Sequence, residues 1–216
     1  MRNCVLLDFD GTITTKDTTK FLLVELLKQS PCRFFFLILL ILKMLCSSNI
    51  SYRQICKNKM IGYLISGYKR DQLQSALERY KKKVEPLFRN LLINKIRETN
   101  HNKDLAVVVT ASPTFVVSFC MTDLPVIVIG TEFKMNGVFY SGELDGNNCF
   151  GYEKVKKVKK LIKSLSLQIN IKESWSDNFS DYPMMKMANH RYWIGDFRLK
   201  NQVNKIDPDG RFILDE

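Results

Sequence analysis

The residues best placed to do chemistry are two aspartates one position apart, Asp8 and Asp10, which directly follow the apolar run at residues 5–7. Carboxylates are rarely buried without partners, and open α/β sheets bind ligands beyond the carboxyl ends of their strands. Such a pair could act as a nucleophile and as an acid–base group. Asp10-Gly11 is also a strong turn signal and Asp8 could cap a helix, so a structural interpretation of the pair stays open.

Three further places carry polar side chains beside predicted elements. Thr110 follows the apolar run at residues 105–109, Lys154 lies at the start of a predicted helix, and Asp177 and Asp181 follow a predicted strand. Each has a structural alternative. Thr110 could cap the next helix, Lys154 belongs to a lysine-rich run of the kind that forms a solvated helix face, and two acids four residues apart suit a strand-to-helix turn.

The elements that would position these residues form an α/β pattern. Apolar runs predict strands at residues 3–7, 105–109, 126–129, 171–175 and 192–194, with helices between most of them. This alternation predicts a Rossmann-like three-layer core with a mostly parallel sheet. Asn136-Gly137, between residues 131–135 and 138–143, predicts a hairpin.

A helical insertion is expected between the first two strands. Residues 15–84 contain no convincing strand and several helical segments, so they predict a small helical cap domain, with residues 1–14 and 85–216 forming the α/β core. Within the insertion, residues 34–45 are apolar on every side but shorter than the about 20 residues that span a bilayer. They favour either a shallow interfacial segment or a helix buried in the cap or in a cap-to-cap dimer. Four flanking cations suit an anionic membrane face: Lys28, Arg33, Lys43 and Arg53.

Composition limits the class of protein and its partners. The 216 residues are 45% apolar, which is enough for a sizeable core, and 33 Lys and Arg against 22 Asp and Glu give a net charge of +11. This charge favours an anionic partner, whether a phosphorylated substrate, a nucleic acid or an acidic membrane. Six cysteines without a Cys-x-x-Cys pair argue against a zinc site and indicate reduced thiols. The first strand begins so close to Met1 that no signal peptide is expected, which predicts a cytoplasmic location.

The four polar places follow the order and spacing of a known superfamily. In this arrangement the chain resembles the haloacid dehalogenase superfamily, and in particular its phosphoserine-phosphatase-like branch, which has a helical cap after the first motif. The four motifs are Asp8-Phe9-Asp10-Gly11-Thr12, Thr110-Ala111-Ser112, Gly151-Tyr152-Glu153-Lys154 and Ser176-Asp177-Asn178-Phe179-Ser180-Asp181. Within the branch the chain is similar to bacterial phosphatidylglycerophosphatases, which share the apolar cap segment and the last two motifs. It departs from them at Trp175, where Tyr is usual, and in the tail from Ile194 onward.

The resemblance implies a phosphomonoesterase that works through an aspartyl-phosphate intermediate. Asp8 would be the nucleophile, and Asp10 would protonate the leaving group and then activate water. The presence of Asp10 disfavours a dehalogenase, because a departing halide needs no proton. The residues implied to bind phosphate are Phe9, Thr110, Ala111 and Lys154.

The carboxylates around a phosphate dianion would repel one another without a cation, so magnesium is expected as the cofactor. Its ligands would be Asp8, the backbone carbonyl of Asp10, and Asp177, with waters completing the shell. Thr12 and Asp181 would orient these groups. Asp17 could contact the substrate or cap the helix that follows it.

Three functions from different classes follow from these observations. The favoured one is a phosphatase of a phospholipid head group such as phosphatidylglycerol phosphate, acting as a peripheral protein on the inner face of an anionic membrane. The alternative is a phosphatase of a soluble phosphomonoester such as phosphoserine. The third is a non-catalytic protein that binds membrane or nucleic acid. No nucleic-acid partner is expected because the chain carries no recognised nucleic-acid motif.

Overall fold

The computed structural model describes residues 2–214 and divides the chain into two compact units. The α/β unit comprises Met1–Asp17, Leu87–Gly130 and Cys149–Glu216, and the helical unit comprises Thr18–Pro86 and Thr131–Asn148. Each unit is built from segments that are distant in the sequence.

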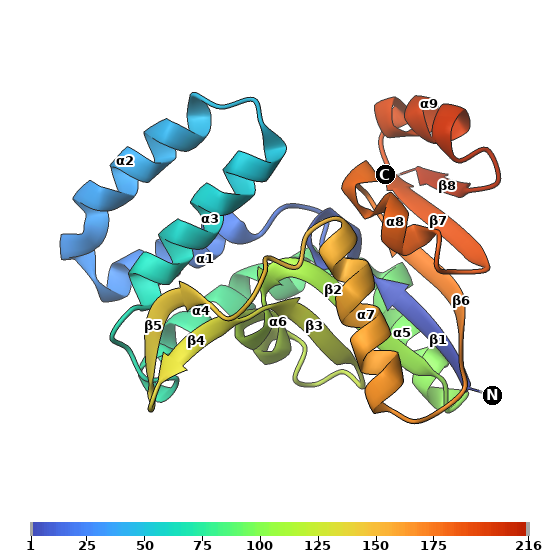
Figure 1. The fold of residues 1–216 in the computed structure, drawn as a ribbon, viewed down its shortest axis with the longest axis horizontal. Helices are drawn as coiled ribbons and strands as arrows, with labels where there is room; N and C mark the ends of the chain where they lie inside the picture. Colours follow the sequence, from blue (N-terminus) through green and yellow to red (C-terminus); the bar gives the residue numbers. More distant parts are fainter. Residues whose placement is uncertain (1, 215–216) are drawn as a thin grey trace. The chain divides into compact units, whose positions relative to one another are not determined.

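The α/β unit contains a six-stranded sheet in the order β3-β2-β1-β6-β7-β8 (Figure 1). Its strands are β1 (Arg2–Leu7), β2 (Leu105–Pro113), β3 (Ile127–Thr131), β6 (Ile169–Ser176), β7 (His190–Gly195) and β8 (Arg211–Leu214). The strands pair in parallel from β2 through β1, β6 and β7 to β8. This arrangement confirms the predicted α/β fold with a mostly parallel sheet, and it adds β8, which the sequence did not indicate.

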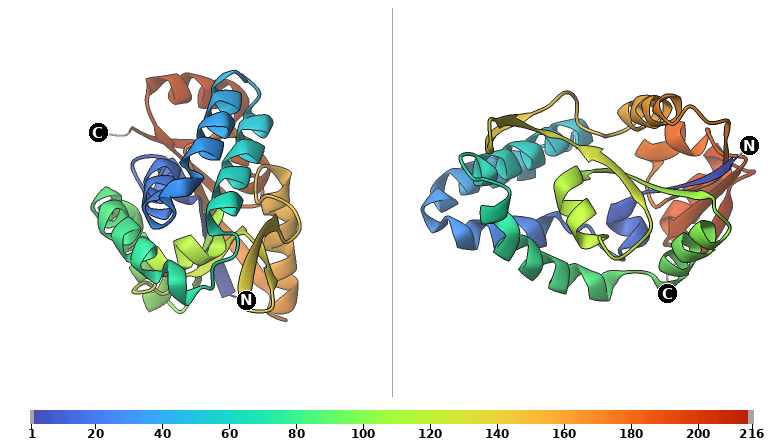
Figure 2. Two further views of the ribbon diagram at one scale, coloured as in Figure 1. Left: turned by 90° about the vertical axis from the view of Figure 1, so that its left-hand side faces the viewer. Right: turned by 90° about the horizontal axis from the view of Figure 1, so that it is seen from below.

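Helices cover both faces of this sheet. Those of the α/β unit are α5 (Asn90–His101), α6 (Thr114–Cys120), α7 (Tyr152–Ser164), α8 (Tyr182–Met185) and α9 (Phe197–Ile206). Figure 2 shows α5 and α7 on opposite faces. Cys4 and Leu6 of β1 pack in one core cluster with Val155 and Val158 of α7. The alternate residues of β1 point to the other face and are also buried, as expected for a parallel strand covered on both sides.

The order in which the chain adds strands to the sheet reverses at β1. The chain passes from β1 to β2 on one side, whereas β6 lies on the other side of β1, so β1 stands at a topological switch point. Leu7 pairs with Val108 of β2 and with Trp175 of β6. The residues that follow these three strands therefore emerge at one edge of the sheet, where α/β proteins bind ligands.

The helical unit contains four α-helices and a β-hairpin among the described residues. They are α1 (Thr19–Gln29), α2 (Phe34–Leu45), α3 (Ile50–Ile65), α4 (Gln74–Val84), β4 (Phe133–Asn136) and β5 (Phe139–Leu144). A Cβ atom on Gly62 of α3 would lie 2.0 Å from the backbone oxygen of Gly142 in β5, so the two backbones are in direct contact. The expected boundary at 15–84 left the hairpin out of this unit, because strand pairing alone does not show which helix a hairpin packs against.

Several short turns complete the chain. An irregular turn spans Phe9–Ile13, and single 3-10 turns span Pro31–Arg33, Asp71–Leu73, Glu85–Leu87 and Phe179–Asp181. The hairpin turn consists of residues 137 and 138, one position later than predicted, with Gly137 at φ +61°. All six cysteines are free thiols, four of them buried.

The apolar helix α2 is only partly buried. Leu37 and Leu40 are buried, whereas Phe35, Leu39 and Leu45 are 79%, 57% and 66% exposed. The helix therefore packs along one stripe, and six of its large apolar side chains are exposed. Among residues 2–214, no helix is long and apolar enough to cross a membrane.

Candidate active site

The turn after β1 fixes the backbone of the two aspartates. The N–H of Asp8 donates to the carbonyl of Trp175 in β6, at 3.0 Å, so Asp8 continues the strand pairing. Gly11 has φ +83°, and a Cβ atom there would lie 2.1 Å from Oδ2 of Asp177. Only glycine allows this close approach between the first and fourth motifs, since any side chain would displace the Asp177 carboxylate.

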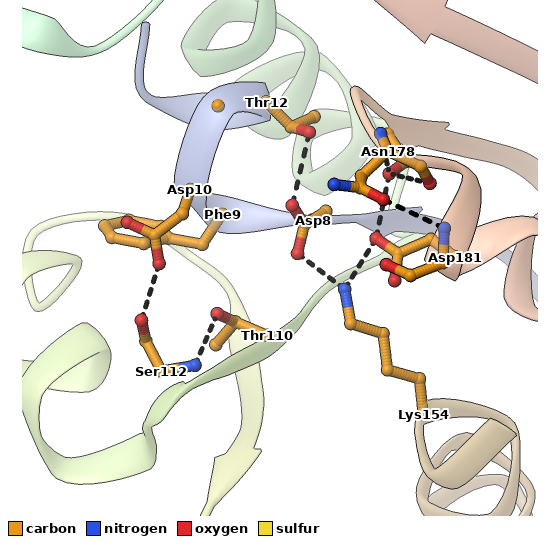
Figure 3. Close-up of polar contacts among 12 residues, drawn as sticks. Asp8, Phe9, Asp10, Thr12, Thr110, Ser112, Lys154, Asn178 and Asp181 are labelled. Carbon is orange, nitrogen blue, oxygen red and sulfur yellow. Dashed lines mark hydrogen bonds and ion pairs between the residues drawn. The ribbon is translucent and has the colours of Figure 1, made fainter. Parts of the chain in front are cut away.

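Asp8 belongs to a buried network around one lysine (Figure 3). Lys154 Nζ, at the start of α7, donates to Asp8 Oδ1 at 2.6 Å and to Asp181 Oδ2 at 2.7 Å. Ser176 Oγ also donates to Asp181 Oδ2, at 2.8 Å. The lysine is 2% exposed, so it is not part of a solvated helix face. It joins residues from the first, third and fourth motifs.

Burial and charge act against each other in this network. Burial raises the pKa of Asp8 well above its ordinary value, and the Lys154 ammonium opposes that shift. Burial also disfavours the charge of Lys154, but Asp181 and Asp8 overcome this effect and raise its pKa above the ordinary value. The lysine therefore stays a cation between two carboxyl groups, where positive charge could bind an anion.

Thr12 links the two carboxylates predicted to bind metal. Its Oγ1 lies 3.4 Å from Asp8 Oδ2 and 3.1 Å from Asp177 Oδ1, and it accepts a hydrogen bond from the Asp177 N–H at 3.0 Å. Burial raises the pKa of Asp177 to about 6; the Thr12 hydrogen bond opposes this shift and the charge of Asp181 adds to it. The site thus holds carboxylates that are costly to ionise without a further cation.

Asp10 belongs to a second network, on the side of β2. Ser112 Oγ donates to Asp10 Oδ2 at 2.5 Å, and the Ser112 N–H donates to Thr110 Oγ1 at 3.0 Å. Figure 3 shows the Asp10 side chain directed to Ser112, whereas Asp8 is directed to Lys154 and Thr12. The two aspartates therefore have different partners and different surroundings.

The other candidate phosphate-binding residues lie at the same strand ends. Thr110 is buried within β2, and α6 begins only at Thr114, so Thr110 does not occupy the capping position that was its structural alternative. Phe9 is fully buried and its ring meets that of Phe88 edge to face, so only its backbone could face a ligand. Ala111, next to Thr110 in β2, is half-buried.

Asp17 stands apart from these motifs in the chain. It is exposed and is the last residue of the first segment of the α/β unit. Helix α1 has Thr18, not Asp17, at its N-cap position. The prediction that Asp17 caps this helix is therefore wrong, and the contact of Asp17 with substrate stays a prediction.

Two serines lie within the second and fourth motifs but were given no role in the prediction, Ser112 and Ser176. Each donates to a motif aspartate. Ser112 lies two positions after Thr110, so strand alternation places both on the same face of β2. That spacing was a usable signal, but serine is common at strand ends and its hydroxyl rarely identifies a partner by sequence alone.

A divalent cation fits this donor set. Asp8 and Asp177 share contacts to one hydroxyl, their carboxylates are buried or half-buried, and Asp10 provides a backbone carbonyl in the connecting turn. Mg²⁺ takes oxygen ligands of these kinds and commonly keeps several waters. In the described part of the chain, no group of three or more His, Cys, Asp or Glu side chains is placed to hold a metal ion.

Comparisons with solved structures find the same fold in several proteins. A protein with unknown function from Bordetella pertussis Tohama I aligns over 99% of this chain and 98% of its own, with a TM-score of 0.79 and 17% identity. A phospho-aspartyl intermediate analogue of phosphoserine phosphatase aligns over 100% and 94%, with a TM-score of 0.60 and 12% identity. Cytosolic 5'-nucleotidase IIIB bound to cytidine aligns over 100% and 80%, with a TM-score of 0.66 and 13% identity.

Sequence comparisons give the family. No curated protein matches the chain. The family model described as haloacid dehalogenase-like hydrolase matches residues 5–186, a range that contains every candidate site residue. The finer resemblance to phosphatidylglycerophosphatases stays a prediction. Because the match covers most of the chain, this protein belongs to the haloacid dehalogenase-like hydrolases, which confirms both the predicted superfamily and the prediction of an enzyme.

Proposed function

We propose that this hydrolase is a phosphomonoesterase that uses Asp8 as its nucleophile. The observation that carries the proposal is the separation of the two aspartates: Asp8 pairs with Lys154, and Asp10 is held by Ser112. Two carboxyl groups in different surroundings can take different roles in one reaction. The structural similarity to phosphoserine phosphatase and to a nucleotidase supports the same chemistry.

The first half of the reaction transfers the phosphoryl group to the enzyme. A carboxylate oxygen of Asp8 forms a bond to phosphorus while the bond between phosphorus and the ester oxygen breaks. Asp10, protonated at this stage, gives its proton to the departing oxygen, so the leaving group departs as a neutral alcohol. Asp8 then carries an aspartyl phosphate.

The second half returns the enzyme to its starting state. Asp10, now a carboxylate, takes a proton from water as the water oxygen bonds to phosphorus and the bond from phosphorus to Asp8 breaks. Inorganic phosphate leaves, and Asp10 is again protonated. Each proton that Asp10 gives in the first half is thereby recovered in the second.

Four groups would stabilise the charge on the phosphoryl oxygens. Lys154 supplies a buried ammonium beside Asp8, and Thr110 supplies a hydroxyl. The backbones of Phe9 and Ala111 would supply N–H donors. Fixed donors in a site of low polarity stabilise the transition state without reorganising.

Asp8, Asp177 and the carbonyl of Asp10 would hold Mg²⁺, with Thr12 and Asp181 orienting the carboxylates and Lys154. When bound, the ion would supply the positive charge that Asp8 and a phosphate dianion need in order to approach each other. The bond changes at phosphorus and the proton transfers use Asp8 and Asp10, as described above.

Magnesium is expected to stabilise the protein more at neutral than at acidic pH. The pKa of Asp177, raised from 3.8 to about 6, means that the metal-free folded state holds this proton more tightly than the unfolded state. The protonated Asp177 carboxyl group therefore stabilises the metal-free folded state fully below about pH 4. This stabilisation is lost as the pH rises to about 6, and the free energy of unfolding falls by up to about 3 kcal/mol. Mg²⁺ requires the ionised carboxylate, so its apparent affinity should rise about tenfold from about pH 5 to about pH 7.

Thermal denaturation with Mg²⁺ or with a chelator, at about pH 5 and about pH 7.5, measures this effect. Asp177→Asn is expected to lose most of the magnesium-dependent shift. Asp209→Asn is the matched control, since Asp209 is 91% exposed. If Mg²⁺ raised the melting temperature by the same amount at both pH values, the assignment of Asp177 as a ligand would be contradicted.

The α/β unit carries all of these reacting groups, so we assign it the catalytic role and assign the helical unit the choice of substrate. As part of this proposal we keep the expected core and cap and assign the β4–β5 hairpin to the cap. The favoured substrate is a phosphate on a phospholipid head group.

The helical unit carries two features that support a lipid substrate. Helix α2 exposes Phe35, Leu39, Leu42 and Leu45. Residues 26–70 contain no Asp or Glu but contain eight cations: Lys28, Arg33, Lys43, Arg53, Lys57, Lys59, Lys69 and Arg70. An apolar face within a segment that is only basic is suited to the surface of an anionic bilayer.

Replacing exposed residues of α2 should separate lipid from soluble substrates. In the triple variant Phe35→Ser, Leu39→Ser and Leu42→Ser, we expect vesicle binding and lipid phosphate hydrolysis to fall about 100-fold or more. The reason is that each original side chain would bury apolar area in the bilayer. Hydrolysis of a soluble aryl phosphate should persist. The assay compares phosphate release from anionic vesicles carrying a lipid phosphate with release from the aryl phosphate.

The matched control replaces three exposed apolar residues of the α/β unit, Leu91, Phe197 and Ile206, with Ser; they are 51%, 63% and 50% exposed. This control should keep both activities. If the original protein releases phosphate from soluble esters but neither binds vesicles nor hydrolyses the lipid, the substrate is soluble. If it releases phosphate from no monoester, the proposed function is wrong.

A further inference from the structure

We propose that Ser112 is a positioning residue that holds the Asp10 carboxyl group in line for proton transfer. This inference rests on the proposed function and extends it to a residue to which the proposed reaction gives no role. Ser112 does not touch the reacting atoms of the proposed reaction. It acts through Asp10.

The contact between the two side chains is short and joins separate elements. Ser112 Oγ, at the end of β2, donates to Asp10 Oδ2 at 2.5 Å across 102 positions of sequence. Asp10 has φ −75° and ψ 120°, an extended conformation inside the irregular turn. The bond from β2 therefore ties the Asp10 side chain to a strand outside the turn that carries it.

Ser112 is itself held firmly. A Cβ atom on Gly130 of β3 would lie 2.6 Å from the backbone oxygen of Ser112, so β3 packs directly against this residue. The Ser112 N–H is also engaged, donating to Thr110 Oγ1 at 3.0 Å. A hydroxyl supported by a packed strand can define the position of its partner more narrowly than one on a free loop.

The bond from the Ser112 N–H has a second effect. Because Thr110 Oγ1 accepts this bond, the Thr110 hydroxyl hydrogen is directed toward another acceptor. In the proposed reaction that acceptor is a phosphate oxygen. One residue thus aligns both the acid–base group, through its side chain, and a phosphate donor, through its backbone (Figure 3).

The two roles can be separated by mutation. Ser112→Ala removes the bond to Asp10 but keeps the N–H that donates to Thr110. Misalignment of Asp10 should slow only steps that need its proton. We therefore expect kcat for an alkyl phosphate to fall about 10- to 100-fold, with KM little changed, and kcat for an activated aryl phosphate to change less than about threefold.

The experiment measures both substrates for Ser112→Ala, Ser112→Thr and Asp10→Asn, and for the double variant Ser112→Ala with Asp10→Asn. Ser112→Thr keeps a hydroxyl and should recover most of the alkyl phosphate activity. In the Asp10→Asn background, Ser112→Ala should have almost no further effect, because a positioning residue has nothing left to position. Ser118→Ala, an exposed serine on α6, is the matched control.

The outcomes distinguish this inference from the proposed function. If Asp10→Asn selectively slows the alkyl phosphate but Ser112→Ala does not, the role of Ser112 is wrong and the reaction stands. If Asp10→Asn does not change the ratio of the two rates, the acid–base assignment itself is wrong. If Ser112→Ala slows both substrates equally, or acts as strongly without Asp10, its role is structural and the inference is overturned.

Discussion

Asp8→Asn is expected to reduce phosphate release by about four orders of magnitude or more. An amide cannot attack phosphorus, so neither half of the reaction can proceed through Asp8. The fold should persist, because Asn has the same shape and Lys154 keeps Asp181 as a charged partner. Burial already disfavours the ionised form of Asp8, so loss of that charge should change the free energy of unfolding by only about 1 kcal/mol.

Phosphate release and thermal denaturation, measured side by side, check this prediction. Asp209→Asn makes the same chemical change at a residue that is 91% exposed and should keep full activity. An Asp8→Asn protein that stays folded and still turns over a phosphomonoester would show that another group is the nucleophile.

Lys154→Met should damage both stability and activity. The lysine lies 2.6 Å from Asp8 and 2.7 Å from Asp181, and it is 2% exposed. Removing it leaves buried carboxylates without their cation, which costs about 3–5 kcal/mol at neutral pH. The loss of positive charge beside the transferring group should lower kcat by about three orders of magnitude.

The stability loss in Lys154→Met should depend on pH. Without the ammonium, which opposes the effect of burial, the pKa of Asp8 would rise further, so the folded variant holds a proton that the unfolded chain releases. Its stability deficit should therefore shrink as the pH falls toward about 5. Denaturation of Lys154→Met and of Lys156→Met, whose lysine is 59% exposed, measures this difference. A Lys154→Met protein as stable and active as Lys156→Met would contradict the network.

The motif positions could be predicted because strand ends in a parallel sheet converge. Asp8, Lys154 and Asp181 are far apart in the chain, yet each follows or begins an element whose end lies at the same edge of the sheet. A carboxylate or lysine at such a place has few structural uses, so residue type and order together were informative.

Other features depend on packing that the sequence does not express. Ser112 and Ser176 gain their roles from the partners they meet across the sheet. The β4–β5 hairpin was recognised from its turn, but its place in the helical unit depends on the contact between Gly62 and Gly142. Helix α2 is apolar on all sides, so its sequence could not distinguish buried Leu37 from exposed Phe35.

The covalent intermediate on Asp8 can be trapped chemically during turnover. The protein would be mixed with a phosphomonoester and Mg²⁺, quenched in acid during turnover, and treated with borohydride, which reduces an aspartyl phosphate to homoserine. Mass spectrometry of the tryptic peptide spanning residues 3–16 then locates the modified position. Homoserine at position 8 and unmodified aspartate at position 10 are the expected result. Phosphate release without an acyl phosphate on Asp8, or with one on another residue, would contradict it.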